Sequence, residues 1–308
     1  ITGQRIDGST PGVDPGLPPG ERGTNMGMRG GADASTEAAA LAALGASGRP
    51  PSDADRQMFE NVKRLDDAGH PAATALVEAM AQTKEGDLAA ARGGDAAAAD
   101  RIKAATGMDY KTLDSALRGD SAAMMTAAAV VGAAGSAGAA GSLMARAEQG
   151  DPNARAQLEG RTGISSYALI RASQGDQGAQ MAVMARAGQD ASVQAAAQGG
   201  DPICGDAVRA AEMTYARDAA TGDYTQIAAY NPQTGTFSAT DTQGNILRNA
   251  DGSAQISFDQ ASGVYRTQDG ASVGYDAGSG QWLARDASGA TSSGIVYDVN
   301  DGRFAVAG

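Results

Sequence analysis

A Gly-Asp pair recurs along this chain at a nearly fixed interval, and the interval constrains the fold more than any other feature. Successive pairs are 25, 25, 31, 25 and 25 residues apart, with their glycines at Gly69, Gly94, Gly119, Gly150, Gly175 and Gly200. In the first pair, His70 takes the place of Asp. A fixed period of about 20 to 50 residues is typical of repeat proteins. The sequence therefore predicts a scaffold of repeated units rather than a catalytic fold.

The pair itself indicates a helix boundary. Gly is the preferred residue just after a helix, because it adopts left-handed backbone angles without strain. Asp is a preferred N-cap, since its side chain accepts hydrogen bonds from the first free backbone N–H groups. In three units the next residue is proline: Pro71, Pro152 and Pro202. Proline is favoured at the first position of a helix. One helix is thus expected to end at each Gly and the next to begin after each Asp.

Further positions predict a second helix in each unit. The fourth position of a unit is Ala in five units and Cys204 in the sixth, and the eighth is mostly branched and apolar. These positions are one turn apart, so they form one apolar helix face. The thirteenth position, expected to end the first helix, is glycine at Gly107, Gly132, Gly163 and Gly188. With N-caps expected at Asp109, Ser165 and Asp190, each unit becomes a helix–turn–helix of 25 residues.

The unit of 31 residues contains an apparent six-residue duplication, Ala133–Gly138. It falls in the uncharged run Ser121–Ala145, which is long enough to span a bilayer. Three interpretations stay open: a loop, a Gly-lined helix that packs closely on a neighbour, or a membrane segment. Ala, Gly and Ser insert weakly into lipid, so we expect no membrane span.

Composition changes at both ends of the repeat array. Residues 1–52 are rich in Gly and Pro and predict an extended arm that carries a short helix over Ser35–Ala46. The arm is either disordered or ordered only against a partner. Ser52 or Asp53 is expected to cap a helix running to about Asp67, which opens a helical repeat domain over residues 53–219.

Residues 220–308 show alternating apolar residues and frequent turn residues. A second motif recurs there, with aromatic residues at both ends and a central Gly: YNPQTGTF, FDQASGVY, YDAGSGQW and YDVNDGRF. Its spacing suits a hairpin closed by a cross-strand aromatic pair. The expected fold class is therefore α+β: an extended arm, an all-α helical-hairpin repeat domain and a C-terminal antiparallel β-meander.

Two local resemblances support this division. The stretch ARAEQGDPNARAQLEG, Ala145–Gly160, resembles a helix junction of Sel1-like repeats, which implies an α-solenoid of protein-binding type. The motifs from Tyr230 to Phe304 resemble the YD-type β-hairpin repeats of large secreted and surface proteins.

Charge and composition exclude several classes of function. The net charge of −12 leaves no basic surface for nucleic acid, and no nucleic-acid partner is expected. Walker and dinucleotide fingerprints are absent. A single cysteine excludes an intramolecular disulfide framework. Because the chain starts at Ile1, a signal peptide would not be visible in it.

Few residues qualify for chemistry. His70, the only histidine, stands at an N-cap position, and Cys204 is expected to be a small core residue. Asp298–Gly302 resembles a calcium loop but lacks the distal Glu, so a turn is expected instead. We therefore expect no catalytic, cofactor-binding or metal-binding residues. The candidates for surface recognition are the hairpin aromatics Tyr230, Phe258, Tyr275, Trp282 and Tyr297.

The sequence thus favours a non-enzymatic structural protein, a subunit of a larger assembly such as a phage or virus particle or a bacterial surface structure. Its partners would be other protein subunits, and its location an extracellular particle or cell surface. One alternative is a glycan- or receptor-binding module that uses the hairpin aromatics. A second alternative is a cell-wall hydrolase with carboxylates in the helical part.

Overall fold

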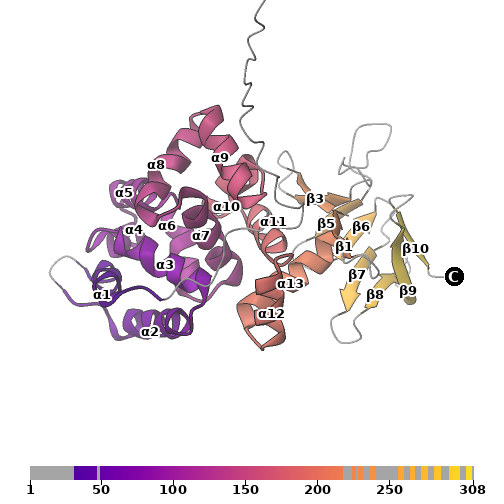
Figure 1. Cartoon of the computed structure of the whole chain (residues 1–308), viewed down its shortest axis with the longest axis horizontal. Coiled ribbons are helices and arrows are strands. Elements are labelled where there is room, and N and C mark those ends of the chain that lie inside the picture. The colour runs from indigo at the N-terminus through magenta and orange to yellow at the C-terminus, as the bar shows by residue number, and fades with distance from the viewer. Residues whose placement is uncertain are drawn as a thin grey trace, which may run out of the picture.

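The computed structural model describes residues 31–46 and 49–217, and beyond them the backbone of short strands between residues 224 and 306 (Figure 1). The helices in this part of the chain are α1 (Ala34–Ala43), α2 (Asp53–Asp67), α3 (Pro71–Ala81), α4 (Asp87–Arg92), α5 (Ala96–Thr106), α6 (Tyr110–Leu117), α7 (Ser121–Ala134), α8 (Ala137–Glu148), α9 (Pro152–Thr162), α10 (Ser166–Ser173), α11 (Gln177–Ala187), α12 (Ala191–Gln198) and α13 (Pro202–Thr214).

The helical repeat is confirmed, and each Gly-Asp pair acts as predicted. The six glycines that precede the first helix of a unit all have left-handed backbone angles, with φ from 79° to 95°. The residue after each glycine is the N-cap of that helix, and its side chain accepts a backbone N–H in every unit. The first unit is α3–α4, and the units follow in order to α11–α12, with α13 opening the sixth.

The contribution of these caps to stability can be tested with a matched pair of variants. Asp95 accepts hydrogen bonds from the N–H groups of Ala97 and Ala98, at 2.9 and 3.1 Å. Asp95→Ala should lower the free energy of unfolding by about 1 kcal/mol in urea denaturation. Asp109, the N-cap residue of α6, makes no such bond, so Asp109→Ala should cost about half as much or less. Equal losses would contradict the capping role of Asp95.

The thirteenth position follows the prediction in three units and departs from it in the long one. Gly107, Gly163 and Gly188 each follow the last residue of a helix. The expected helix end at Gly132 is wrong, because α7 continues to Ala134 and Gly135 takes the left-handed position instead, with φ 84°. The additional residues of this unit therefore lengthen two helices, and the loop interpretation of Ser121–Ala145 is wrong as well.

Helix α7 lies at the centre of the helical domain. It contacts α3, α6, α8, α9, α10, α11 and α13, and ten of its fourteen residues are buried (Figure 1). A helix that is apolar on all sides is stable in water only when other helices surround it. This arrangement differs from an open solenoid, in which each unit contacts only its neighbours. Among the described residues no single helix has the length and apolar character of a membrane span. Helices α7 and α8 have that length and apolar character only when taken as a pair, and they are bent by 88° where they meet.

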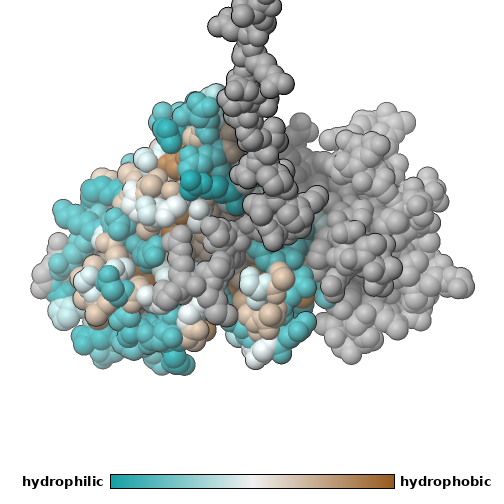
Figure 2. Space-filling model, viewed as in Figure 1, coloured by the Kyte–Doolittle hydropathy of each residue, from teal (hydrophilic) through white to brown (hydrophobic). Residues whose placement is uncertain are grey.

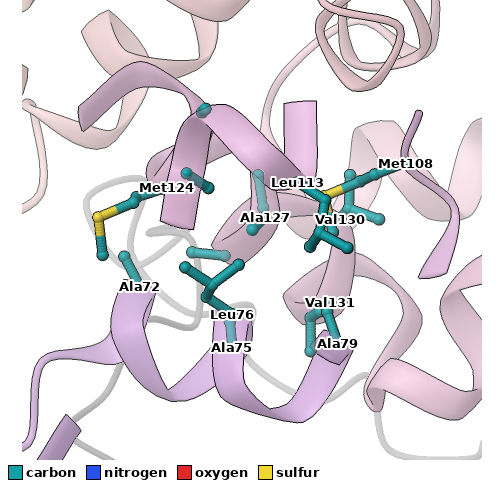
Figure 3. Packing of buried hydrophobic residues seen from close by; sticks show 14 of the residues in the cluster. Ala72, Ala75, Leu76, Ala79, Met108, Leu113, Met124, Ala127, Val130 and Val131 are labelled. Atoms are coloured by element: carbon teal, nitrogen blue, oxygen red, sulfur yellow. The ribbon is translucent and has the colours of Figure 1, made fainter. Parts of the chain in front are cut away.

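Small side chains make the contacts around α7. Ala72, Ala75, Leu76 and Ala79 of α3 face α7, with Leu76 beside Ala127 (Figure 3). On the next turns of α7, Val130 lies beside Leu113 and Met108 (Figure 3). Alanine offers little area for burial but allows helix axes to approach closely, so packing density supplies much of the stability.

Two glycines permit still closer approaches. A Cβ atom on Gly141 of α8 would lie 1.7 Å from the carbonyl oxygen of Ala104 in α5. A Cβ atom on Gly188 would lie 2.0 Å from the carbonyl oxygen of Ala207 in α13. The backbones touch at both places. Of the three interpretations of Ser121–Ala145, the close-packing Gly helix is therefore the one that fits α8.

The predicted start of α2 is also confirmed, with Ser52 as its N-cap. Just before α1, the backbone N–H of Ala32 donates to Asp66 Oδ2 at 3.0 Å. Asp66 is fully buried and also accepts the hydroxyl of Thr74 at 2.5 Å. The chain that enters α1 is thus attached to the helical core by a buried carboxylate.

The expected α+β fold class, with a C-terminal antiparallel β-meander, is wrong for the fold that the structure describes. Fold class depends on the elements that pack around a common core. The core residues lie between Ala40 and Ala207, in helices or in the turns between them. The described fold is therefore all-α. Alternating apolar residues favour extended backbone locally, but a sheet domain also needs a packed apolar face, which alternation alone does not specify.

Extended backbone is present after α13. The strands are β1 (Tyr215–Arg217), β2 (Tyr224–Gln226), β3 (Ala228–Asn231), β4 (Thr236–Ala239), β5 (Ile256–Asp259), β6 (Val264–Thr267), β7 (Ser272–Asp276), β8 (Gln281–Arg285), β9 (Thr291–Asp298) and β10 (Arg303–Val306). Neighbouring strands from β3 to β10 are antiparallel, and the Cα partners include Tyr230–Phe237, Phe258–Tyr265, Tyr275–Trp282 and Tyr297–Phe304. Apart from Tyr215, the side chains of these strands lie outside the described part of the chain, as do most of the residues between the strands.

Candidate functional site

The only histidine and the only cysteine of the chain are neighbours in the fold. Cys204 Sγ lies 3.7 Å from His70 Nε2, although 134 residues separate them. Asp201 Oδ2 lies 3.3 Å from the same histidine nitrogen. Ligand atoms of the three residues lie within 4.8 Å of one another. We call His70, Asp201 and Cys204 the His-Asp-Cys cluster.

The N-terminal ends of two helices position this cluster. His70 is the N-cap of α3 and Asp201 the N-cap of α13, so equivalent positions of the first and sixth units meet here. Asp201 Oδ1 accepts the N–H groups of Ile203 and Cys204, at 2.9 and 3.0 Å. Its other oxygen remains available to face His70. The positive ends of two helix dipoles thus converge on one carboxylate, which is the charge they favour.

The cap hydrogen bond at the start of α3 determines which ring nitrogen of His70 carries the proton. The backbone N–H of Ala72 donates to His70 Nδ1 at 3.2 Å, so Nδ1 must present a lone pair. In the neutral ring the proton then resides on Nε2, which donates toward Asp201. A catalytic thiol–imidazole pair needs the opposite arrangement, in which the nitrogen facing the thiol accepts its proton and a carboxylate holds the other nitrogen. Both Asp201 and Cys204 face the same nitrogen here.

The thiol is likewise unsuited to nucleophilic attack. Burial raises the pKa of Cys204 to about 12, and the charge of Asp201 together with a hydrogen bond to its carboxylate adds to the increase. The thiolate is the nucleophilic form, so almost none of it exists in the folded protein near neutral pH. The cluster is therefore a hydrogen-bonded contact between two helix starts and lacks the features of a thiol active site.

This pKa predicts a slow alkylation of the native protein. The pKa of Cys204 rises from 9.0 to about 12, so the native thiolate population near neutral pH should fall about 1,000-fold relative to an exposed thiol. Iodoacetamide should therefore modify the native chain at least about 1,000-fold more slowly than the chain in urea, as followed by mass spectrometry. Similar rates in both conditions would show an accessible thiolate and contradict this description of the cluster.

Access to the cluster is limited. His70 is 5 % exposed and Cys204 is 2 % exposed, while the side chain of Asp201 is 21 % exposed. An open groove of about 670 Å³ lies nearby, lined partly by Lys111, Asp120, Asp206 and Arg209, but none of the three cluster residues lines it. A small ion could reach the cluster past Asp201, whereas a polymer or peptide substrate could not.

The structure places the remaining candidates as follows. The N-cap position of His70 and the buried core position of Cys204 are confirmed. Tyr230, Phe258, Tyr275, Trp282 and Tyr297 lie in β3, β5, β7, β8 and β9, and their side chains are outside the described part of the chain. Their role in recognition stays a prediction. Most of the calcium-loop sequence Asp298–Gly302 also lies outside the described residues.

Thiol catalysis by Cys204 would require His70, but sequence reasoning gave no grounds for the two residues to meet and so missed the cluster. A signal was nonetheless present in the repeat. His70 replaces the Asp of the other units at the first position, and Cys204 replaces the usual Ala at the fourth position. Two departures from a repeat pattern that introduce reactive residue types would justify testing whether those positions meet.

No known family matches this chain, and neither the curated proteins nor the solved structures contain a significant match to it.

Proposed function

We propose that this chain is a non-enzymatic structural protein, a subunit of a larger assembly such as a phage or virus particle or a bacterial surface structure. The observation that carries the proposal is the His-Asp-Cys cluster. The residues with the greatest potential for catalysis are used to join helix starts, and their protonation opposes nucleophilic chemistry.

The packing of the helical domain supports a scaffold role. Its core consists mainly of alanine and other small residues in closely approaching helices, centred on α7. Such a domain has few voids and little freedom to close around a substrate. It would hold the segments on either side of it at a fixed separation.

The attachment of the arm also supports an assembly role. The arm enters the helical domain at Gly31 and Ala32, where buried Asp66 binds the backbone. Gly- and Pro-rich sequences favour extended backbone, which suits a segment that reaches another subunit. In this proposal the arm reaches a neighbouring subunit and the helical domain serves as its rigid base.

The face of the helical domain seen in Figure 2 carries many hydrophilic residues, which fits a domain whose contacts are made elsewhere. Hydrophilic residues predominate over α2 and over much of the face in Figure 2. Within the described residues Tyr167 is the one large hydrophobic side chain that is exposed, at 48 %. A stable interface through the helical surface alone would need a larger apolar patch.

The test is the association state of the full chain, compared with a variant that lacks residues 1–30. Multi-angle light scattering should show concentration-dependent association of the full chain, and the shortened variant should remain monomeric. A monodisperse full chain with saturable glycan binding that Trp282→Ala abolishes would favour the recognition module instead. Cell-wall clearing that depends on one Glu would favour the hydrolase.

A further inference from the structure

We infer that the His-Asp-Cys cluster is a binding site for a divalent zinc-like cation that joins the first and sixth repeat units. The ion would join the same two helix starts that the hydrogen-bonded cluster joins, so the structural role proposed above holds with or without it. The inference rests on the types of the three side chains, their spacing and their origin from two distant helix starts.

The residue types fit a borderline metal ion. Imidazole nitrogen, thiolate sulfur and carboxylate oxygen together are ligands that zinc accepts, whereas magnesium and calcium prefer oxygen alone. Three protein ligands leave one tetrahedral position open for water, and the partial exposure of Asp201 provides the side from which water can enter. Two anionic ligands neutralise the charge of the ion, so a buried site would carry no net charge.

The distances fit the same ion. Zinc lies about 2.0 Å from ligand nitrogen and oxygen and about 2.3 Å from sulfur, so tetrahedral geometry places nitrogen about 3.3 Å from oxygen and about 3.6 Å from sulfur. In the cluster, His70 Nε2 is 3.3 Å from Asp201 Oδ2 and 3.7 Å from Cys204 Sγ. The second distance also matches the separation of two ligands of one ion. The two distances from His70 Nε2 therefore need to change little on binding, and the carboxylate oxygen and the sulfur lie within 4.8 Å of each other.

Metal binding requires a change in the hydrogen bonds of His70. Coordination through Nε2 moves the ring proton to Nδ1, and the cap bond from Ala72 must then be lost. Binding also converts the Cys204 thiol to the thiolate, and its proton is released to solvent. The metal–ligand bonds must therefore offset both the lost cap bond and this deprotonation.

The two departures from the repeat pattern provide an independent argument. In the other units, Asp at the first position and Ala at the fourth serve the helix cap and the core. The chain has one His and one Cys, and both lie where the first unit meets the sixth. A metal ligand set explains both replacements together.

The experiment is a cobalt titration of the reduced, metal-free full chain. Co²⁺ should bind with one-to-one stoichiometry and produce a thiolate-to-cobalt charge-transfer band, and Zn²⁺ should displace it. Cys204→Ala restores the residue usual at this position, so it should fold normally, lose the band and bind at least about 100-fold more weakly. His70→Asn keeps a capping side chain and should also lose high-affinity binding.

Controls separate this site from weak binding to an acidic surface. Asp95→Ala removes an equivalent cap from another unit and should leave cobalt binding unchanged. Zn²⁺ should raise the melting temperature of the wild-type chain but not that of Cys204→Ala, and excess Mg²⁺ should have no such effect. Absence of the charge-transfer band, together with equal melting temperatures in Zn²⁺ and in EDTA, would overturn the inference. Self-association plays no part in either measurement, so failure here leaves the assembly proposal standing.

Discussion

Gly141→Ala is expected to destabilise the helical domain by about 3 kcal/mol or more, although alanine is the best helix former. The reason is steric. The added methyl group would lie 1.7 Å from the carbonyl oxygen of Ala104, and backbone cannot move aside as a flexible side chain can. Helices α5 and α8 would have to separate, which exposes core on both sides. Urea denaturation followed by circular dichroism measures the loss.

The same substitution elsewhere in the long unit provides the control. Gly132 lies within α7, and a Cβ atom there would meet nothing within 4 Å. Gly132→Ala should therefore raise the free energy of unfolding by about 0.5 to 1 kcal/mol, because alanine loses less backbone entropy on folding. If both variants shifted stability in the same direction, the close contact of α5 with α8 would be wrong.

His70→Asp is expected to destabilise the protein by about 3 kcal/mol, although it makes the first unit match the others. Asp is a good N-cap, so the substitution taken alone should preserve α3. In the fold, however, the introduced carboxylate would face Asp201, whose Oδ2 now lies 3.3 Å from His70 Nε2. Two like charges in a poorly solvated position repel strongly. Urea denaturation in EDTA measures the effect without any contribution from metal.

Two further variants identify charge as the cause. His70→Asn is similar in size to His70→Asp but uncharged, and it should cost about 1 kcal/mol or less. The double variant His70→Asp/Asp201→Asn should recover most of the lost stability, because one carboxylate then remains. The loss in His70→Asp should also shrink as the pH falls toward the range in which carboxyl groups protonate. A loss that persists in the double variant would contradict the repulsion.

Local features of this fold could be predicted from the sequence because local chemistry determines them. A glycine such as Gly94 followed by Asp95 specifies a helix end and a helix start without any distant partner. The period, the order of the helices and the cap of α2 at Ser52 followed from such signals. The same reasoning placed a helix end at Gly132, where the longer unit uses Gly135 instead.

Features that depend on distant contacts could not be predicted in this way. A helix apolar on all sides fits both a protein core and a membrane, so the central place of α7 had no signature in Ser121–Ala145. The meeting of His70 with Cys204 depends on how the units curve around α7, and the repeat pattern does not encode that path. The fold class was wrong for a related reason: alternation near Tyr230 and Phe258 predicts extended backbone but does not show what packs on it.

The contact between His70 and Asp201 also limits how this chain can evolve in length. Open repeat arrays gain and lose whole units readily, since each unit contacts only its neighbours. Here a chain with one unit fewer would lack the helix start that His70 meets, and an additional unit would displace it. Growth is therefore confined to the interior of a unit, as in the six additional residues near Ala133–Gly138. The contact between the first and sixth units therefore fixes the number of units in this fold, whereas the length of a unit can vary.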